Sequence, residues 1–202
     1  MPAHEPLLAC RGLTRRPWFE DYELAIEAGE IGAISAPTGT GKTLLLRAIA
    51  DLDPVDSGEV FLRGGARSRL SPPAWRRQVL YVHPGGVRLA GTVADNLAAV
   101  HSLKASGDGP DAAAAPLPAL EGAAAADRLS SGEAQLLALQ RALLLAPAVL
   151  LLDESTSALD RETASEVERG LRAYADGGRA VLWVSHDLEL ADRVGARRIP
   201  FP

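Results

Sequence analysis

Short apolar runs alternate along the chain with segments that repeat apolar positions at the 3.6-residue period of a helix. This alternation is typical of strands joined by helices in a largely parallel sheet, so it predicts the α/β class. The last three runs are almost entirely apolar, which predicts strands buried on both faces. The predicted strands span residues 7–13, 22–26, 31–36, 79–82, 149–153 and 180–185. The predicted helices begin near Lys42, Val93, Ser131, Arg161 and Leu188.

Residues 104–127 interrupt this pattern. The stretch consists mainly of Ala, Pro and Gly and holds few side chains able to anchor a core. Its two runs of four alanines fit either short helices or a loose linker. No segment of the chain is repeated, which argues against a tandem or solenoid architecture.

Composition adds limits on class and location. A chain of 202 residues with 47% hydrophobic residues is long enough for one globular domain with its own core. The net charge of -5 gives no basic field for nucleic acid, so we expect no nucleic acid partner. The longest apolar run, residues 142–152, contains Pro147 and is shorter than the roughly 20 residues of a spanning helix. With no visible secretory signal and a single cysteine, Cys10, we expect no disulfide partner and a reducing, cytoplasmic location.

The sequence APTGTGKT at residues 36–43 lies between a predicted strand and a predicted helix. In the pattern G-x-x-x-x-G-K-[ST], glycines let successive backbone N–H groups point at phosphate oxygens, and the helix N-terminus adds its positive dipole end. Lys42 would neutralise β- and γ-phosphate charge, and Thr43 would give its hydroxyl to Mg²⁺. The predicted nucleotide-binding residues are Thr38, Gly39, Thr40, Gly41, Lys42 and Thr43.

One position of this loop departs from the pattern, because Ala36 replaces the opening glycine. If the position needs a positive φ, alanine costs roughly 1 kcal/mol or more relative to glycine. The remaining loop is intact, so we expect phosphate binding to survive. The alternative is a Gly-rich turn that caps a helix and leaves Lys42 in solvent.

Two carboxylates and a histidine follow the later predicted strands. Asp153 and Glu154 come at the carboxyl end of the strand at 149–153, where open α/β sheets bind ligands. Asp153 is predicted to hold Mg²⁺, Glu154 to accept the proton of the attacking water, and His186 to hydrogen-bond the γ-phosphate. Taken alone, the acidic pair also fits a helix start and the histidine a structural role.

Further motifs make the pattern specific. LSSGE stands at residues 129–133, STSALD at 155–160 and GTVADNL at 91–97, in order with the phosphate loop, AVLLLDE and VSHD. Over essentially the whole chain this order resembles the ATP-binding cassette (ABC) family, most closely the small ATPase subunits of metal or iron export systems. The resemblance implies a P-loop NTPase (RecA-like) core, an antiparallel β subdomain and an inserted helical signature subdomain. It implies one domain, 1–202, with its core at 1–83 and 146–202 and the helical insert at 84–145.

The resemblance also implies a mechanism shared between two chains. ATP and Mg²⁺ would bind each chain, with Asp160 among the nucleotide-binding residues. The signature residues Ser130, Ser131 and Gly132 would cap the γ-phosphate of ATP held by a facing second copy. Hydrolysis would reopen the dimer and drive a separate membrane-spanning permease subunit, so the chain would lie peripherally on the inner face of the plasma membrane. Locally, Ser130 or Ser131 also fits a helix cap, with Glu133 in the first turn.

Three features depart from the family pattern. Ser131 replaces a glycine of the signature, and Pro84 stands where the family has a glutamine that contacts Mg²⁺ and the attacking water. Proline has no side-chain amide, so the hydrolysis rate and its coupling to the partner stay open; the adjacent His83 has no predictable orientation. No aromatic residue aligns with the family's adenine platform. Trp18 is the nearest candidate and Arg15 or Arg16 could stack instead, while Trp18 could equally belong to the core.

The function predicted from these observations is that of an ATP-hydrolysing subunit that powers a transporter through nucleotide-driven dimer closure. One alternative is an ATP-responsive binding module with weak or no hydrolysis. Another is a non-transport cassette protein that acts on ribosomes or DNA.

Overall fold

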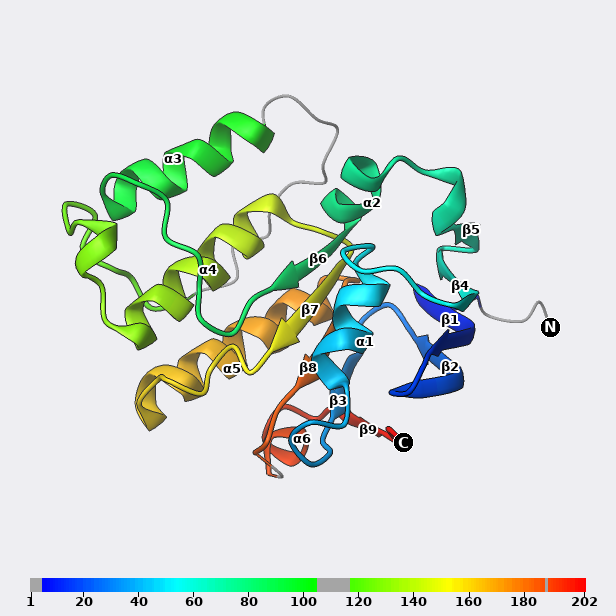
Figure 1. Ribbon diagram of the computed structural model, residues 1–202. Helices are drawn as coiled ribbons and strands as arrows, with labels where there is room; N and C mark the ends of the chain where they lie inside the picture. Colours follow the sequence, from blue (N-terminus) through cyan, green and yellow to red (C-terminus); the bar gives the residue numbers. More distant parts are fainter. Residues whose placement is uncertain (1–4, 105–116, 188) are drawn as a thin grey trace.

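The computed structural model describes residues 5–104, 117–187 and 189–202, and its strands form two sheets (Figure 1). The parallel sheet runs in the order β6 (Val79–Val82), β7 (Val149–Asp153), β8 (Ala180–Val184), β3 (Ile31–Ile34) and β9 (Arg197–Ile199). The antiparallel sheet runs in the order β2 (Phe19–Ile26), β1 (Leu8–Arg15), β4 (Ser57–Leu62) and β5 (Gly65–Ala66). The predicted α/β class with a parallel core and an antiparallel β part is confirmed.

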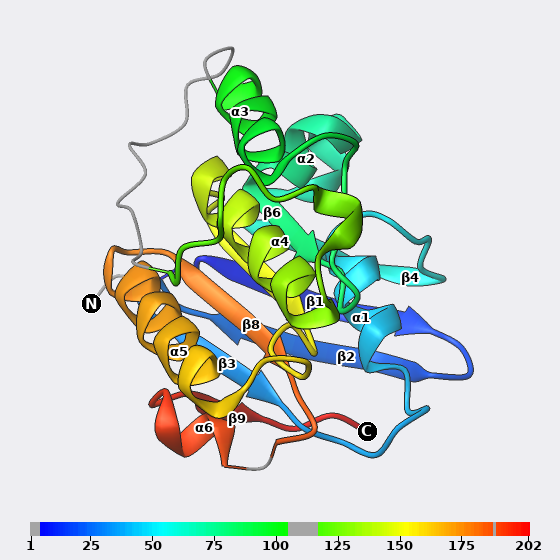
Figure 2. The same cartoon turned by 90° about the vertical axis from the view of Figure 1, so that its left-hand side faces the viewer.

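Helices cover both faces of the parallel sheet, as Figure 2 shows. Helix α1 and the antiparallel sheet pack on one face, whereas α4, α5 and α6 pack on the other. Helix α3 lies against α4 at the outer side of the molecule. The helices are α1 (Lys42–Ile49), α2 (Pro72–Gln78), α3 (Val93–Lys104), α4 (Ser131–Leu145), α5 (Arg161–Asp176) and α6 (Leu190–Arg193), with short 3-10 turns at η1 (Arg67–Arg69) and η2 (Ala126–Arg128).

The central strands are almost entirely apolar because each contributes to two cores. In β7, Val149 and Leu151 pack toward α1, and Leu150 and Leu152 pack toward α4 and α5. This is the two-residue period of a strand buried on both faces. Each fully buried Leu or Val stabilises the fold by roughly 1.5–3 kcal/mol relative to an exposed one.

The expectation of burial on both faces is wrong for β6. This strand is the edge of the parallel sheet, and Leu80 and Tyr81 are only partly buried. The sequence analysis also missed β4, β5, β9 and α2. These elements are short or carry Gly, Pro and Arg, so their apolar pattern is too weak to detect. The last helix begins at Leu190, whereas residue 188, its predicted start, lies outside the described residues.

In the region between α3 and α4, more side chains pack against the core than the composition of this region suggests. The first alanine run lies outside the described residues, but residues 117–129 are described. Leu117 and Leu120 pack against the core, which the sequence analysis did not expect. The second alanine run forms a turn in which Ala125 pairs with Thr92 and Ala126 is fully buried. Among the described helices, none is long and apolar enough to cross a membrane.

Candidate functional site

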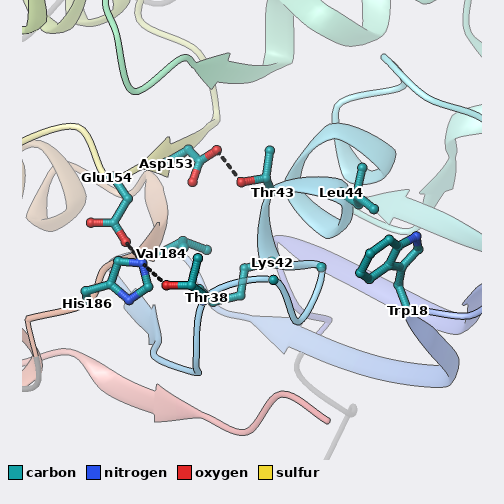
Figure 3. A pocket seen from close by; sticks show the side chains of 11 residues that line it. Trp18, Thr38, Lys42, Thr43, Leu44, Asp153, Glu154, Val184 and His186 are labelled. Carbon is teal, nitrogen blue, oxygen red and sulfur yellow. Dashed lines mark hydrogen bonds and ion pairs between the residues drawn. The ribbon is translucent and has the colours of Figure 1, made fainter.

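Strand order brings three chain segments to one edge of the sheet. Strand β8 lies between β3 and β7, and all three are parallel, with Ile34 and Asp153 both opposite Val184. The loops that follow these strands therefore leave the sheet side by side. They enclose a cavity of 240 Å³ (Figure 3). Its lining comprises Trp18, Thr38, Gly39, Gly41, Lys42, Thr43, Leu44, Asp153, Glu154, Val184 and His186.

The loop after β3 has the backbone that the phosphate pattern requires. Gly39 and Gly41 have φ of 84° and 101°, a conformation that side chains disfavour, and Gly41 caps α1. A Cβ at Gly41 would also lie 2.9 Å from the Cβ of Trp18. Ala36 does not have a positive φ, so its replacement of the usual glycine carries no backbone penalty. Thr40 does not line the cavity; its hydroxyl donates to the Pro37 carbonyl at 3.0 Å.

The Lys42 ammonium is folded back onto its own loop. Its Nζ donates to the carbonyl oxygens of Ala36 at 2.5 Å and Pro37 at 2.8 Å, and the residue is 6% exposed. Burial lowers the pKa of Lys42, while the nearby Glu154 and Asp153 carboxylates act in the opposite direction. A lysine with two carbonyl acceptors is held in place without a counter-ion, and a phosphate oxygen could replace either acceptor.

Two hydroxyl groups hold the Asp153 carboxylate. The hydroxyls of Thr43 and Tyr81 both donate to Asp153 Oδ2 at 2.8 Å, and Asp153 is 2% exposed. Burial and the hydrogen bond to Asp153 raise the pKa of Tyr81. The sequence analysis missed Tyr81, because its contact depends on β6 lying beside β7.

The donor set fits Mg²⁺. A threonine hydroxyl and a carboxylate are oxygen ligands, which this ion prefers, and it keeps several water ligands in addition. No group of three or more His, Cys, Asp or Glu side chains within residues 5–104, 117–187 and 189–202 could hold a metal alone. Thr43 and Asp153 would thus supply part of a coordination shell that phosphate oxygens and water complete.

The Glu154 side chain lies beside Asp153 and points toward His186 (Figure 3). Glu154 has a φ of 48°, and its Oε1 is buried without a hydrogen-bond partner in the part of the chain that the structure describes. That oxygen lies 3.4 Å from His186 Nε2, which in turn lies 3.5 Å from Thr38 Oγ1. Burial raises the pKa of Glu154, partly offset by His186. A half-buried carboxylate with a raised pKa and a free lone pair can accept a proton.

Trp18 lies at the far end of the cavity from His186 (Figure 3). It is 40% exposed, while its neighbour Phe19 is 2% exposed and packs in the core. The alternative that Trp18 belongs to the core is thus wrong. An exposed indole at the cavity edge offers a flat face for a ring to stack on.

The signature residues and Asp160 do not line this cavity. Ser130 caps α4 in a capping box with Glu133, and Asp160 caps α5 by accepting from the backbone of Glu162 and Thr163. Ser131 is exposed in the first turn of α4. A Cβ at Gly132 would lie 2.6 Å from the Ala158 carbonyl oxygen, so this glycine lets the loop after β7 approach α4. The local helix-cap interpretation is therefore observed.

The ABC transporter family model matches residues 19–157, more than half of the chain. The chain belongs to the ABC transporter family. Among its relatives, it is 35% identical to the sulfate/thiosulfate import ATP-binding protein CysA of Brucella melitensis, over 89% of this chain and 54% of that protein. It is 37% identical to the probable iron export ATP-binding protein FetA of Escherichia coli K12, over 87% of this chain and 82% of that protein. The chain therefore spans about half the length of the CysA relatives.

Solved structures show the same fold for this ABC family member. The ATP-binding subunit of an ABC transporter superposes with a TM-score of 0.80 at 22% identity, covering 93% of this chain and 82% of that one. A dimeric ATP-binding cassette in a post-hydrolysis state with ADP and Pi gives a TM-score of 0.78 at 23% identity, covering 92% and 90%.

A second cavity of 360 Å³ opens between β6, α3 and α4 of this ABC chain. Its lining is largely apolar and includes Val87 and Leu103, which are 54% and 58% exposed. Arg141 also lines it and donates to the Val87 carbonyl at 2.6 Å. Within the described chain, Arg141 Nε is buried without a partner, and burial lowers the pKa of the guanidinium. We call this cavity the β6/α3/α4 groove.

Proposed function

We propose that the chain binds ATP with Mg²⁺ and hydrolyses it to ADP and phosphate as the energy-supplying subunit of an ABC transporter. One observation carries the proposal: a buried lysine, a Thr43–Asp153 oxygen pair and a Glu154–His186 pair line a single cavity at the carboxyl edge of the sheet. These groups provide phosphate charge compensation, a partial Mg²⁺ shell and a base, which are the parts that phosphoryl transfer requires.

The residues act in the following roles. Backbone N–H groups of the loop and Lys42 hold the β- and γ-phosphates, and the Trp18 indole supports the adenine ring. Thr43 and Asp153 hold Mg²⁺, which when bound neutralises charge on the phosphate oxygens. Glu154 accepts a proton from water as the water oxygen bonds the γ-phosphorus and the bond to the β-phosphate oxygen breaks. His186, 3.5 Å from Thr38, donates a hydrogen bond to the γ-phosphate as ADP leaves.

The proposed ATP site is completed by a second copy of the chain. Ser130, Ser131, Gly132 and Asp160 lie outside the cavity of their own chain, and all four stand at helix N-termini. A helix N-terminus attracts phosphate, so the start of α4 can cap the γ-phosphate held by a facing chain. The dimeric fold relative with ADP and Pi supports this arrangement.

Pro84 favours a second candidate, an ATP-responsive module with little turnover, because it offers no side-chain amide to the site. A measurement of phosphate release distinguishes the ATP-hydrolysing subunit from the binding module. With ATP and Mg²⁺ the purified chain releases phosphate continuously, and chelation of Mg²⁺ by EDTA stops it. Equilibrium ATP binding with phosphate release no faster than that of Glu154→Gln would instead establish the binding module.

The β6/α3/α4 groove is proposed to receive a short helix of a membrane-spanning permease subunit, which would hold the chain at the cytoplasmic face of the membrane. The groove offers exposed apolar side chains and the Arg141 guanidinium, whose Nε is buried and has no hydrogen-bond partner among the described residues. The fitting partner is therefore a helix with apolar side chains and one carboxylate.

Replacing Leu103 in this groove by aspartate should weaken that contact, because it places a charge on an apolar docking surface. We expect at least a tenfold loss of co-purification with the permease subunit, and unchanged basal phosphate release. Leu70→Asp is the matched control, since Leu70 is also exposed, at 45%, but lies outside the groove. Equal loss in both variants would contradict docking at the groove.

A further inference from the structure

The Gln135 side chain, on the first turns of α4, contacts both the segment after β6 and the loop after β7. It is 4% exposed and its Nε2 lies 2.6 Å from the Pro84 carbonyl oxygen and 3.2 Å from the Glu154 carbonyl oxygen. The same nitrogen lies 3.2 Å from Ser157 Oγ, and Oε1 accepts from the Ala158 N–H at 3.0 Å. Two backbone carbonyls can only accept and the Ala158 N–H can only donate, so the network fixes which end of the amide is nitrogen.

The segment after β6 approaches α4 closely around this side chain. A Cβ at Gly86 would lie 2.4 Å from the Ala134 carbonyl oxygen, so backbone packs on backbone there. Pro84 has neither a backbone N–H nor a side-chain amide, and its carbonyl oxygen makes the shortest of the Gln135 contacts. Through Gln135, α4 therefore links this segment to the loop that carries Glu154.

We propose that Gln135 is a positioning residue that makes the Pro84 segment, Glu154 and the Ser157–Ala158 turn move together with the signature helix α4. The inference rests on the proposed ATPase function and deepens it. Displacement of α4 by a partner at the adjacent groove, or by the γ-phosphate of a facing chain, shifts Glu154 through its own carbonyl. Gln135 acts on turnover by fixing the base, without touching nucleotide.

Variants of Gln135 and Gln140 test this role. Gln140 is on the same helix and its Nε2 donates to the Pro118 carbonyl at 2.6 Å, away from the nucleotide cavity, so Gln140→Leu is the matched control. Gln135→Leu should lower kcat for phosphate release at least tenfold with KM for ATP within twofold of wild type. Gln140→Leu should leave both kcat and KM within twofold of wild type, even if it lowers the melting temperature as much as Gln135→Leu does. Equal kcat in the two variants would overturn the inference.

Hydrogen exchange gives a readout that needs no turnover. The Ala158 N–H has Gln135 Oε1 as its acceptor, so Gln135→Leu should speed its exchange at least tenfold while Gln140→Leu does not. Gln135→Glu keeps an acceptor for that N–H but cannot donate to Pro84, so protection at Ala158 persists while kcat falls. A wild-type chain that binds ATP without releasing phosphate would refute the proposed ATPase alone. Unchanged Ala158 exchange in Gln135→Leu would refute the positioning role.

Discussion

Replacing Lys42 by alanine will weaken ATP binding by about 100-fold or more. The ammonium is 6% exposed and held by the Ala36 and Pro37 carbonyls, so exchange of these acceptors for phosphate oxygens gives charge-assisted hydrogen bonds in a poorly hydrated site. Losing such bonds costs about 3 kcal/mol, and each 1.4 kcal/mol is a factor of ten in affinity. Equilibrium titration with a fluorescent ATP analogue in the presence of Mg²⁺ measures the effect.

A control variant distinguishes the effect of the Lys42 charge on ATP affinity from the effect of loop order. Thr40→Ala also removes a hydrogen bond to the Pro37 carbonyl but removes no charge, so it should lower ATP affinity only a few-fold. An unchanged affinity in Lys42→Ala would contradict the assignment of the loop. Equal losses in both variants would show that loop order, and not phosphate charge compensation, sets the affinity.

The parallel core was predictable because its central strands can be recognised from their own sequences. The strand β8 is a run of five apolar residues and β7 begins with a run of four, and polar residues follow each run at the same sheet edge. The antiparallel sheet was only partly predictable. The strand β4 reads SGEVFL with its first two residues exposed, so no regular alternation marks it.

The residues of the candidate site also fall into a predictable group and an unpredictable group. Residues within local motifs, such as Lys42, Thr43 and Asp153, were predictable because a short stretch of backbone sets their geometry. Tyr81 and Gln135 were not, because their roles depend on contacts between segments far apart in the sequence, across β6 to β7 and from α4 to the loop after β7. Only the strand order and the position of α4 bring those contacts together.

Replacing Glu154 by glutamine should lower phosphate release by about 100-fold or more while ATP affinity stays within a few-fold. The substitution preserves shape but removes the proton acceptor, and general-base catalysis typically contributes 10²–10⁴-fold. In the wild type, burial raises the pKa of Glu154, so turnover should fall as the pH drops through that raised pKa. Glu121→Gln removes an exposed carboxylate outside the cavity and should leave turnover unchanged.

The same Glu154→Gln variant tests whether the site is shared between two chains. With ATP and Mg²⁺ but without turnover, the closed state no longer reopens, so light scattering should report a dimer at saturating nucleotide and a monomer after nucleotide is removed. Adding Ser131→Trp places a bulky side chain on the exposed first turn of α4, where a facing γ-phosphate would approach. The double variant should bind ATP but stay monomeric, since each cavity is intact and only the facing surface is blocked. A dimer that persists in the double variant would mean that α4 does not face the partner's nucleotide.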